Sequence, residues 1–150
     1  MTRLWRLVTV TATSLCLIAL AACEPIDGGM TLPSCVVHAD NPHKSETTPG
    51  FMTAKGWFKC ERTTPREVRL SVNLQQRAKN GQWVDVAESG ELSMAVPRQG
   101  QRSKDVVVSL PCAMGLGTFQ TWAMIRGVSA SGELVESEPT TSREVKNPCH

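Results

Sequence analysis

The stretch EVRLSVNLQQ, residues 67–76, alternates polar and apolar side chains from Glu67 to Gln75. Val68, Leu70, Val72 and Leu74 occupy one set of alternate positions, and mostly charged, amide or hydroxyl residues occupy the other. Successive side chains of a β-strand point to opposite faces of a sheet, so this pattern predicts a strand with one buried and one solvated face. The stretch therefore favours an antiparallel sheet that packs on one side only.

The strand leads into a predicted hairpin. A three-residue loop, Lys79-Asn80-Gly81 with its glycine in the left-handed region, would return the chain so that residue 74 faces 86 and residue 76 faces 84. That register places Val84 and Val86 on the core face of the sheet. A two-residue Asn-Gly turn would place both valines on the opposite face, so the sequence favours the three-residue loop.

The rest of the chain repeats short alternating runs between turn residues, and no stretch of ten residues has a convincing helical period. Further strands are predicted over 34–39, 51–61, 92–96, 103–110 and 118–126, with a polar loop at 41–50. After a turn at 129–132 (SASG), residues 133–137 and then 142–146 return the chain. Seven to eight short antiparallel strands predict an all-β, immunoglobulin-like sandwich. A small β-barrel is the alternative.

The first 22 residues have the layout of a secretory signal. Arg3 and Arg6 precede a largely apolar run, Leu7–Leu20, which is shorter than the ~20 residues of a membrane-spanning helix. Small alanines follow it. Residues 1–22 are therefore predicted to be a signal peptide.

The signal ends in Leu20-Ala21-Ala22-Cys23, which resembles a bacterial lipobox. In such signals the cysteine thiol receives a diacylglycerol and becomes the mature N-terminus, so Cys23 is the predicted lipidation site. Residues 23–33 would be the lipidated N-terminus and tether, and residues 34–150 the β-sandwich domain. An ordinary secretory signal cut near Ala21 or Ala22, without lipid, is the alternative.

Charge and length limit the classes of function. Once Arg3 and Arg6 leave with the signal, 14 Lys and Arg residues balance 14 Asp and Glu residues. A nucleic-acid-binding domain would carry a basic surplus, so we expect no nucleic-acid partner. The remaining residues are enough for one domain with a real core.

Four cysteines remain for disulfides if Cys23 carries lipid and Cys16 leaves with the signal. Cys35 and Cys60 lie symmetrically about the polar loop at 41–50, and Cys112 and Cys149 lie symmetrically about the turn at 129–132. Hairpins would bring each pair together, which favours 35–60 and 112–149. The alternative is an inter-sheet bridge between Cys60 and Cys112, together with a bridge between Cys35 and Cys149 that joins the two ends of the domain. It stays open because sequence does not prove connectivity.

Residues 50–150 also resemble small exported proteins and lipoproteins of actinobacteria, of the mycobacterial type. The similarity rests on a strand that ends at Cys60, on Leu74–Arg77 leading to the hairpin Gly81–Trp83, and on the segment Cys112–Thr118. The resemblance implies a disulfide-bonded, immunoglobulin-like sandwich in the cell envelope. It implies no established activity and no catalytic residues.

Candidates for catalysis are weak. His38, Asp40 and His43 lie close in sequence, but no fourth zinc ligand is evident, and the histidines are expected to be two exposed loop residues. No G-x-S-x-G setting, C-x-x-C pair or complete phosphate-binding loop occurs. We therefore expect no catalytic residues, no metal site, no cofactor and no enzyme.

The sequence favours a non-enzymatic lipoprotein on the outer face of the cell membrane, with a binding or scaffolding role. Its partners would be the membrane, through the N-terminal lipid, and an envelope protein that contacts Arg77 and Trp83, since arginine and tryptophan are frequent in contact hot spots. The alternative is a secreted protease inhibitor that presents the disulfide-anchored loop 112–117. An anchored protein partitions into detergent, whereas such an inhibitor is found free in the medium.

Overall fold

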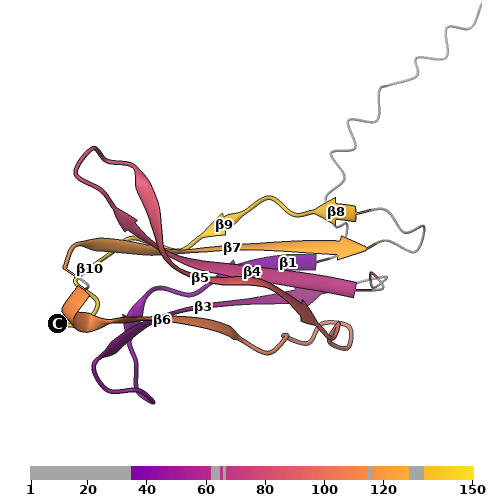
Figure 1. Ribbon diagram of the computed structural model, residues 1–150. Coiled ribbons are helices and arrows are strands. Elements are labelled where there is room, and N and C mark those ends of the chain that lie inside the picture. Colours follow the sequence, from indigo (N-terminus) through magenta and orange to yellow (C-terminus); the bar gives the residue numbers. More distant parts are fainter. Residues whose placement is uncertain (1–34, 62–64, 66, 115, 129–133) are drawn as a thin grey trace, which may run out of the picture.

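A computed structural model describes residues 35–61, 65, 67–114, 116–128 and 134–150, and these residues are almost entirely β-strand (Figure 1). The strands are β1 (Cys35–Ala39), β2 (His43–Lys44), β3 (Phe51–Cys60), β4 (Glu67–Arg77), β5 (Trp83–Met94), β6 (Val106–Pro111), β7 (Thr118–Val128), β8 (Leu134–Glu136), β9 (Thr140–Thr141) and β10 (Val145–Lys146). A short 3-10 turn, η1 (Cys112–Met114), follows β6.

The strands form two antiparallel sheets. In the first sheet, β3 is central: β1 and β2 pair with successive parts of one edge, and β6 pairs with the other edge. In the second sheet the order is β5-β4-β7, and β8, β9 and β10 line the outer edge of β7 in turn. Neither sheet closes on itself, so the fold is a β-sandwich and the barrel alternative is wrong.

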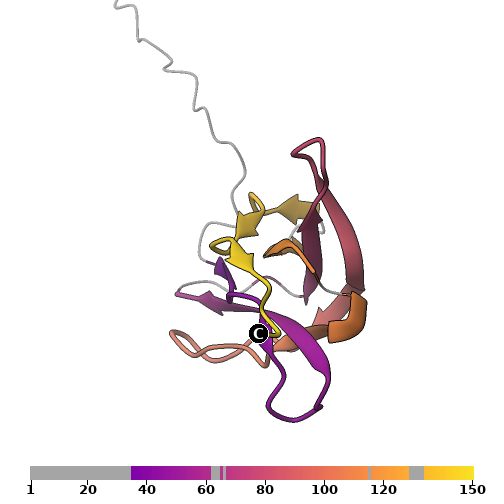
Figure 2. The same ribbon diagram turned by 90° about the vertical axis from the view of Figure 1, so that its left-hand side faces the viewer.

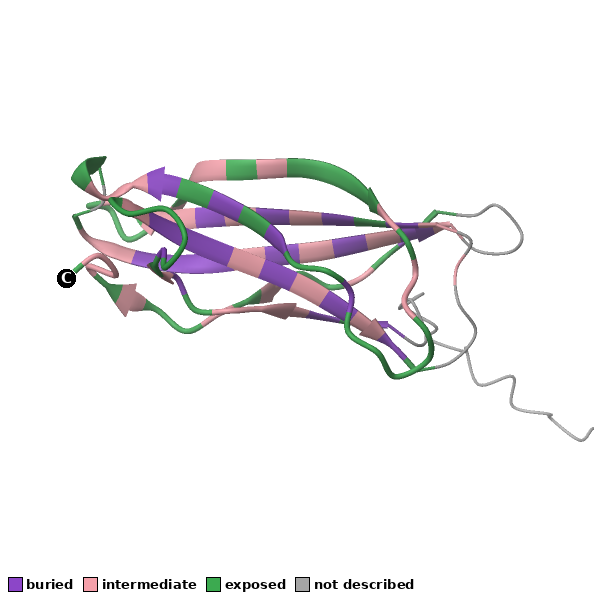
Figure 3. Ribbon diagram, turned by 90° about the horizontal axis from the view of Figure 1, so that it is seen from below, coloured by how far each residue is buried: buried purple, intermediate pink, exposed green. Residues whose placement is uncertain are grey.

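The core lies between the two sheets, and it follows the alternation seen in the sequence. Along β4 the four apolar side chains of the 67–76 stretch are fully buried, while their neighbours are at least partly exposed. Figure 3 shows the same alternation as bands of buried and less buried residues along the strands. The largest buried side chains are Phe58, Phe119, Met52, Leu70, Leu74 and Ile125.

One glycine allows the two sheets to approach closely. Gly56 lies in the centre of β3, and a Cβ added there would come within 2.5 Å of Val72 Cγ2 and 3.2 Å of Ala123 Cβ, both in the opposite sheet. Either distance is shorter than an ordinary carbon contact of roughly 3.5–4.0 Å. The absence of a side chain at Gly56 therefore sets the spacing of the sheets here.

The predicted hairpin loop is confirmed. The backbone N–H of Ala78 donates to the Gln82 carbonyl at 2.8 Å, which leaves three loop residues, and Gly81 has a φ of 84°. The register prediction is confirmed where residue 76 faces 84 but wrong one step further on, because Leu74 faces residue 87 and not 86. A bulge between residues 74 and 75 inserts the extra residue.

The predicted core position of Val84 is wrong. Its side chain is 50% exposed, whereas Val86 is partly buried and packs against the core. The predicted strand 92–96 is also not a separate element, since β5 runs on to Met94 and Leu92 is 44% exposed. Bulges rotate a strand and re-aim its side chains, so a strictly alternating reading fails along β5.

The C-terminal edge strand is broken into three short pieces. Between these pieces the hydroxyls of Ser137 and Ser142 accept hydrogen bonds from the N–H groups of Ile125 and Thr121 in β7. Pro139 lies between the two serines, and because proline has no backbone N–H it cannot donate a hydrogen bond to the neighbouring strand. An interrupted edge of this kind is a poor template for pairing with another chain.

Several predictions fall outside the described residues. The signal peptide 1–22, the lipidation site Cys23, the tether 23–33 and the turn at 129–132 are among them. Within the described ranges, no helix is long and apolar enough to cross a membrane.

Candidate functional site

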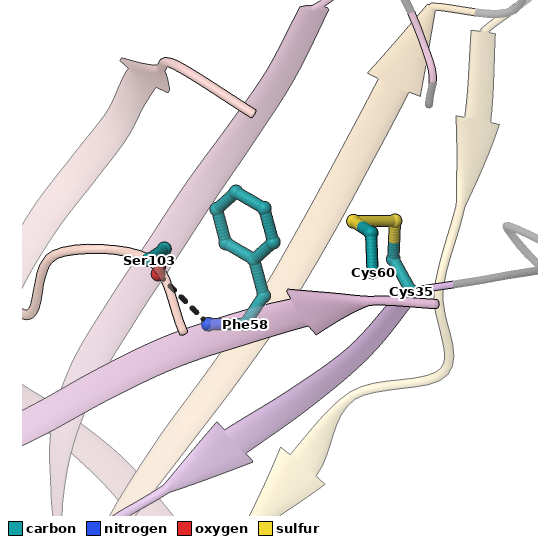
Figure 4. Close-up of a disulfide and its surroundings, with 4 residues drawn as sticks. All are labelled: Cys35, Phe58, Cys60 and Ser103. Carbon is teal, nitrogen blue, oxygen red and sulfur yellow. Dashed lines mark hydrogen bonds between the residues drawn. A yellow bond between two sulfur atoms is a disulfide. The ribbon is translucent and has the colours of Figure 1, made fainter. Parts of the chain in front are cut away.

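The first disulfide joins two neighbouring strands of one sheet. Cys35 of β1 faces Cys60 of β3 directly, with their Cα atoms 3.9 Å apart, and both side chains are buried (Figure 4). Beside it, the backbone N–H of Phe58 donates to the buried Ser103 hydroxyl at 3.0 Å. This bridge fastens β1 to the central strand of the first sheet.

The second disulfide joins the two sheets. Cys112 follows β6 of the first sheet and Cys149 follows β10 of the second, and their Cα atoms are 5.8 Å apart. The preferred pairing of the four cysteines is thus confirmed, and the alternative with bridges 60–112 and 35–149 is wrong. The symmetric spacing about two turns was a sufficient signal for it.

The two disulfides mark opposite ends of the sandwich. The described chain begins at Cys35, at the right-hand end in Figure 1, and Cys149 lies near the C-terminus at the left-hand end. We call the left-hand end the distal end; the segment 40–50, the hairpin loop 78–82, η1 and residues 147–150 gather there. Whatever precedes Cys35 in the chain joins the sandwich at the end opposite these loops.

Arg77 and Trp83, the predicted contact residues, lie side by side at the distal end. They are direct cross-strand partners at the end of β4 and the start of β5, next to the loop 78–82 of the hairpin that projects from the sandwich (Figure 2). Arg77 Nη1 lies 3.4 Å from Glu144 Oε2, in an ion pair in which each side chain is 50% exposed. The hairpin therefore presents a cation and an indole ring together, with the ion pair accessible to solvent.

The segment 112–117 also reaches the distal surface. Met114 is 66% exposed and Leu116 is 69% exposed, beside a hollow of about 390 Å³ that is lined by Lys44, Gly50, Cys112, Ala113, Leu116, Cys149 and His150. The Leu116 carbonyl accepts a hydrogen bond from Gln76 Nε2 at 2.8 Å. Cys112–Met114, the first half of this segment, is a 3-10 turn.

The outer face of the second sheet carries a chain of ion pairs. Arg69 contacts Glu67 at 2.9 Å and Glu91 at 3.7 Å, and the Arg126 guanidinium lies against both Glu91 and Glu136. The hydrogen bond from Arg69 lowers the pKa of the Glu67 carboxyl and raises the pKa of Arg69. Two arginines thus lie among three glutamates here, so this part of the sheet carries charges of both signs.

The expectation of two exposed loop histidines is wrong. His38 lies in β1, half-buried, and stacks on Trp57 with ring centroids 3.9 Å apart; His43 lies in β2 and is also half-buried. Asp40 accepts a hydrogen bond from Trp57 Nε1 at 3.1 Å, and the Arg102 guanidinium carbon lies 4.3 Å from the Trp57 ring centroid. Among the residues described, no group of His, Cys, Asp and Glu side chains is arranged to hold a metal ion.

This Trp57 cluster (His38, Asp40, Trp57 and Arg102) went unpredicted, although a signal was present. Once Cys35 is opposite Cys60 in an antiparallel pair, His38 is necessarily opposite Trp57. The Arg102 contact had no sequence signal, since it comes from the segment before β6 on the other side of β3. The cluster joins three separate parts of the chain on the outer face of the first sheet, which is a structural role.

Comparison with known proteins adds no relative from which a function could be carried over to this chain. No protein-family model matches the sequence, and no curated protein is significantly similar to it.

Proposed function

We propose that this protein is an exported, non-enzymatic lipoprotein that is anchored at the outer face of the cell membrane and binds or scaffolds an envelope protein. The lipobox-like sequence that ends at Cys23 is the basis for the anchor. The disulfides support it, because Cys35, Cys60, Cys112 and Cys149 pair with one another and leave none of the four for Cys23. Disulfides are also typical of proteins outside the cytoplasm.

The observation that carries the binding role is the position of the exposed loops. The domain begins at Cys35, and the distal end with Arg77, Trp83, Met114 and Leu116 lies opposite (Figure 1). A tether that enters at Cys35 would leave these side chains farthest from the membrane and accessible to another protein. Exposed methionine, tryptophan and arginine are frequent in the cores of protein interfaces.

The anchor is tested by the fate of the exported protein. We expect wild-type protein to partition into the detergent phase of a cloud-point extraction, and Cys23→Ser to stay in the aqueous phase. Cys16→Ser is the matched control, because that residue would leave with the signal, and it should partition like wild type. Intact mass should begin at Cys23 with added acyl chains and should gain about four hydrogens on reduction.

An aqueous wild-type protein with an unmodified N-terminus would refute the anchor.

The binding role needs a separate measurement, since an anchored protein need not have a partner. A photo-crosslinking amino acid in place of Met114 should yield one adduct of defined mass on living cells, and the same probe in place of Leu134 should not. Leu134 is a fair control because it is 55% exposed but lies at the opposite end of the sandwich. Equal adducts from both positions would contradict a binding surface at the distal end.

A further inference from the structure

A polar hollow of about 320 Å³ lies on the outer face of the first sheet, beside the segment 40–50. It is lined by His43, Ser45, Glu46, Thr47, Thr53, Lys55, Asp105 and Val107. Thr53 and Lys55 are outward-facing residues of β3, between buried residues on either side, and Val107 is the cross-strand partner of Lys55. Two strands therefore form the floor of the hollow, and β2 with the loop 45–47 forms a wall.

The hydrogen bonds at one end of the hollow have a defined direction. His43 Nδ1 lies 3.0 Å from the Asn41 carbonyl oxygen, and a carbonyl only accepts, so Nδ1 carries the hydrogen. In the neutral imidazole, Nε2 then accepts from the Thr53 hydroxyl, 3.3 Å away. Thr53 is only 5% exposed. Because its hydroxyl hydrogen is then used in the bond to His43, its oxygen can only accept a further hydrogen bond. This end of the hollow is suited to a ligand group that donates hydrogen bonds.

Two opposite charges border the hollow without a partner in the described part of the chain. Neither the Lys55 ammonium nor the Glu46 carboxylate forms an ion pair there, whereas Asp105 is already paired with Arg102. The loop that carries Glu46 is held by a hydrogen bond from the Thr48 N–H to the buried Ser45 hydroxyl at 3.0 Å. The hollow thus has one positive and one negative group, each available to a ligand.

We propose that this hollow binds a free α-amino acid as its zwitterion. The ligand carboxylate would lie against the Lys55 ammonium, and its ammonium group would donate to the Glu46 carboxylate and the Thr53 oxygen. A hollow of about 320 Å³ has room for a single amino acid. Val107, which is 49% exposed beside Lys55 in the floor, favours an apolar ligand side chain. The proposal does not depend on the lipid anchor or on a protein partner.

The test uses the full chain as the exporting cell produces it. Saturation-transfer NMR with the standard α-amino acids identifies the strongest ligand, and titration calorimetry measures its Kd. We expect a neutral, apolar amino acid to bind, and its N-acetyl and amide derivatives to bind at least tenfold more weakly. Lys55→Gln and Glu46→Gln should each weaken binding at least tenfold. Lys59→Gln is the matched control on the same face of β3, where Lys59 pairs with Glu61, and should leave Kd unchanged.

Four results would overturn the proposal. One is the absence of any saturation transfer from every amino acid at millimolar concentration, with the protein shown to be folded by its thermal melt. Another is equal affinity for the N-acetyl and amide derivatives, which would mean that the site does not recognise the charged groups of the amino acid. The third is a loss of binding affinity in Lys59→Gln that is as large as the loss in Lys55→Gln. A dipeptide that binds more tightly than any single amino acid would also contradict it.

Discussion

The close approach of the two sheets makes a quantitative prediction for Gly56→Ala. The added methyl would lie 2.5 Å from Val72 Cγ2 and 3.2 Å from Ala123 Cβ. Reaching an ordinary contact of roughly 3.5–4.0 Å requires a displacement of about 1 Å. Val72 is β-branched and Ala123 has no rotamer, so neither neighbour can turn away at low cost. Overpacking costs about 1–3 kcal/mol, and we expect the upper half of that range.

A double-mutant cycle tests whether the cost arises at this contact. Val72→Ala removes the clashing methyl group, and by itself it should destabilise by about 2 kcal/mol through lost burial and the cavity left behind. Gly56→Ala introduced into Val72→Ala should then cost less than about 1 kcal/mol. The two substitutions should therefore be coupled by about 1–2 kcal/mol, with the double variant more stable than additivity predicts.

The assay is urea unfolding with the disulfides intact, followed by tryptophan fluorescence and analysed at constant slope. Gly81→Ala is the control, because it is strained by its φ of 84° yet has no atom within 4 Å of the added Cβ. It should destabilise without coupling to Val72→Ala. A cost below about 0.5 kcal/mol for Gly56→Ala, or strict additivity in the cycle, would refute the reasoning about sheet spacing.

Three further predictions concern the disulfides and the surface charges. The double substitution Cys112→Ser with Cys149→Ser should lower the free energy of unfolding by about 4 kcal/mol, because the bridge spans a sequence separation of 37 residues and restricts the entropy of the unfolded chain. Urea unfolding measures this loss, and a value below about 1 kcal/mol would contradict the prediction. Because the folded-state pKa of Glu67 lies below its ordinary value of 4.5, its contribution to stability is present above that pH and is lost as the pH falls through the lowered value. Arg69→Gln should therefore destabilise the protein at neutral pH, and this destabilisation should disappear in acid. Thermal melts of the variant and the wild type from pH 7 to 2 test this, and a difference in melting temperature that persists in acid would refute the role of the Glu67 carboxylate. Arg77→Ala should change stability by less than about 1 kcal/mol, because its ion pair is exposed, and a larger loss in the thermal melt would contradict that reading.

Much of the fold could be predicted because it depends on neighbouring residues. Side-chain direction alternates along any strand, so the pattern in residues 67–76 identified the buried face of β4. The left-handed preference of Gly81 is equally local, and it located the hairpin loop. The cysteine pairs followed from their symmetric spacing about turns, which antiparallel pairing converts into proximity.

The candidate sites were less predictable, since they depend on register and on contacts between distant segments. Val84 was expected in the core and has its predicted partner Gln76, but it lies next to the loop 78–82, where the hairpin projects from the sandwich, and it is half exposed. Arg102 reaches Trp57 only because the segment before β6 runs beside β3. Nothing near Lys55 in the sequence indicates that it shares a hollow with His43 and Glu46.

The sequence by itself determined the all-β class, the buried face of the longest alternating stretch and the preferred disulfide pairs. Each of these is a matter of residue type and spacing within one segment or one hairpin. The tertiary structure alone decided the sandwich over the barrel, the sheet spacing at Gly56, the Trp57 cluster and the polar hollow. These depend on how two twisted sheets stack and on where bulges shift the register, and both are set by the sum of many long-range contacts.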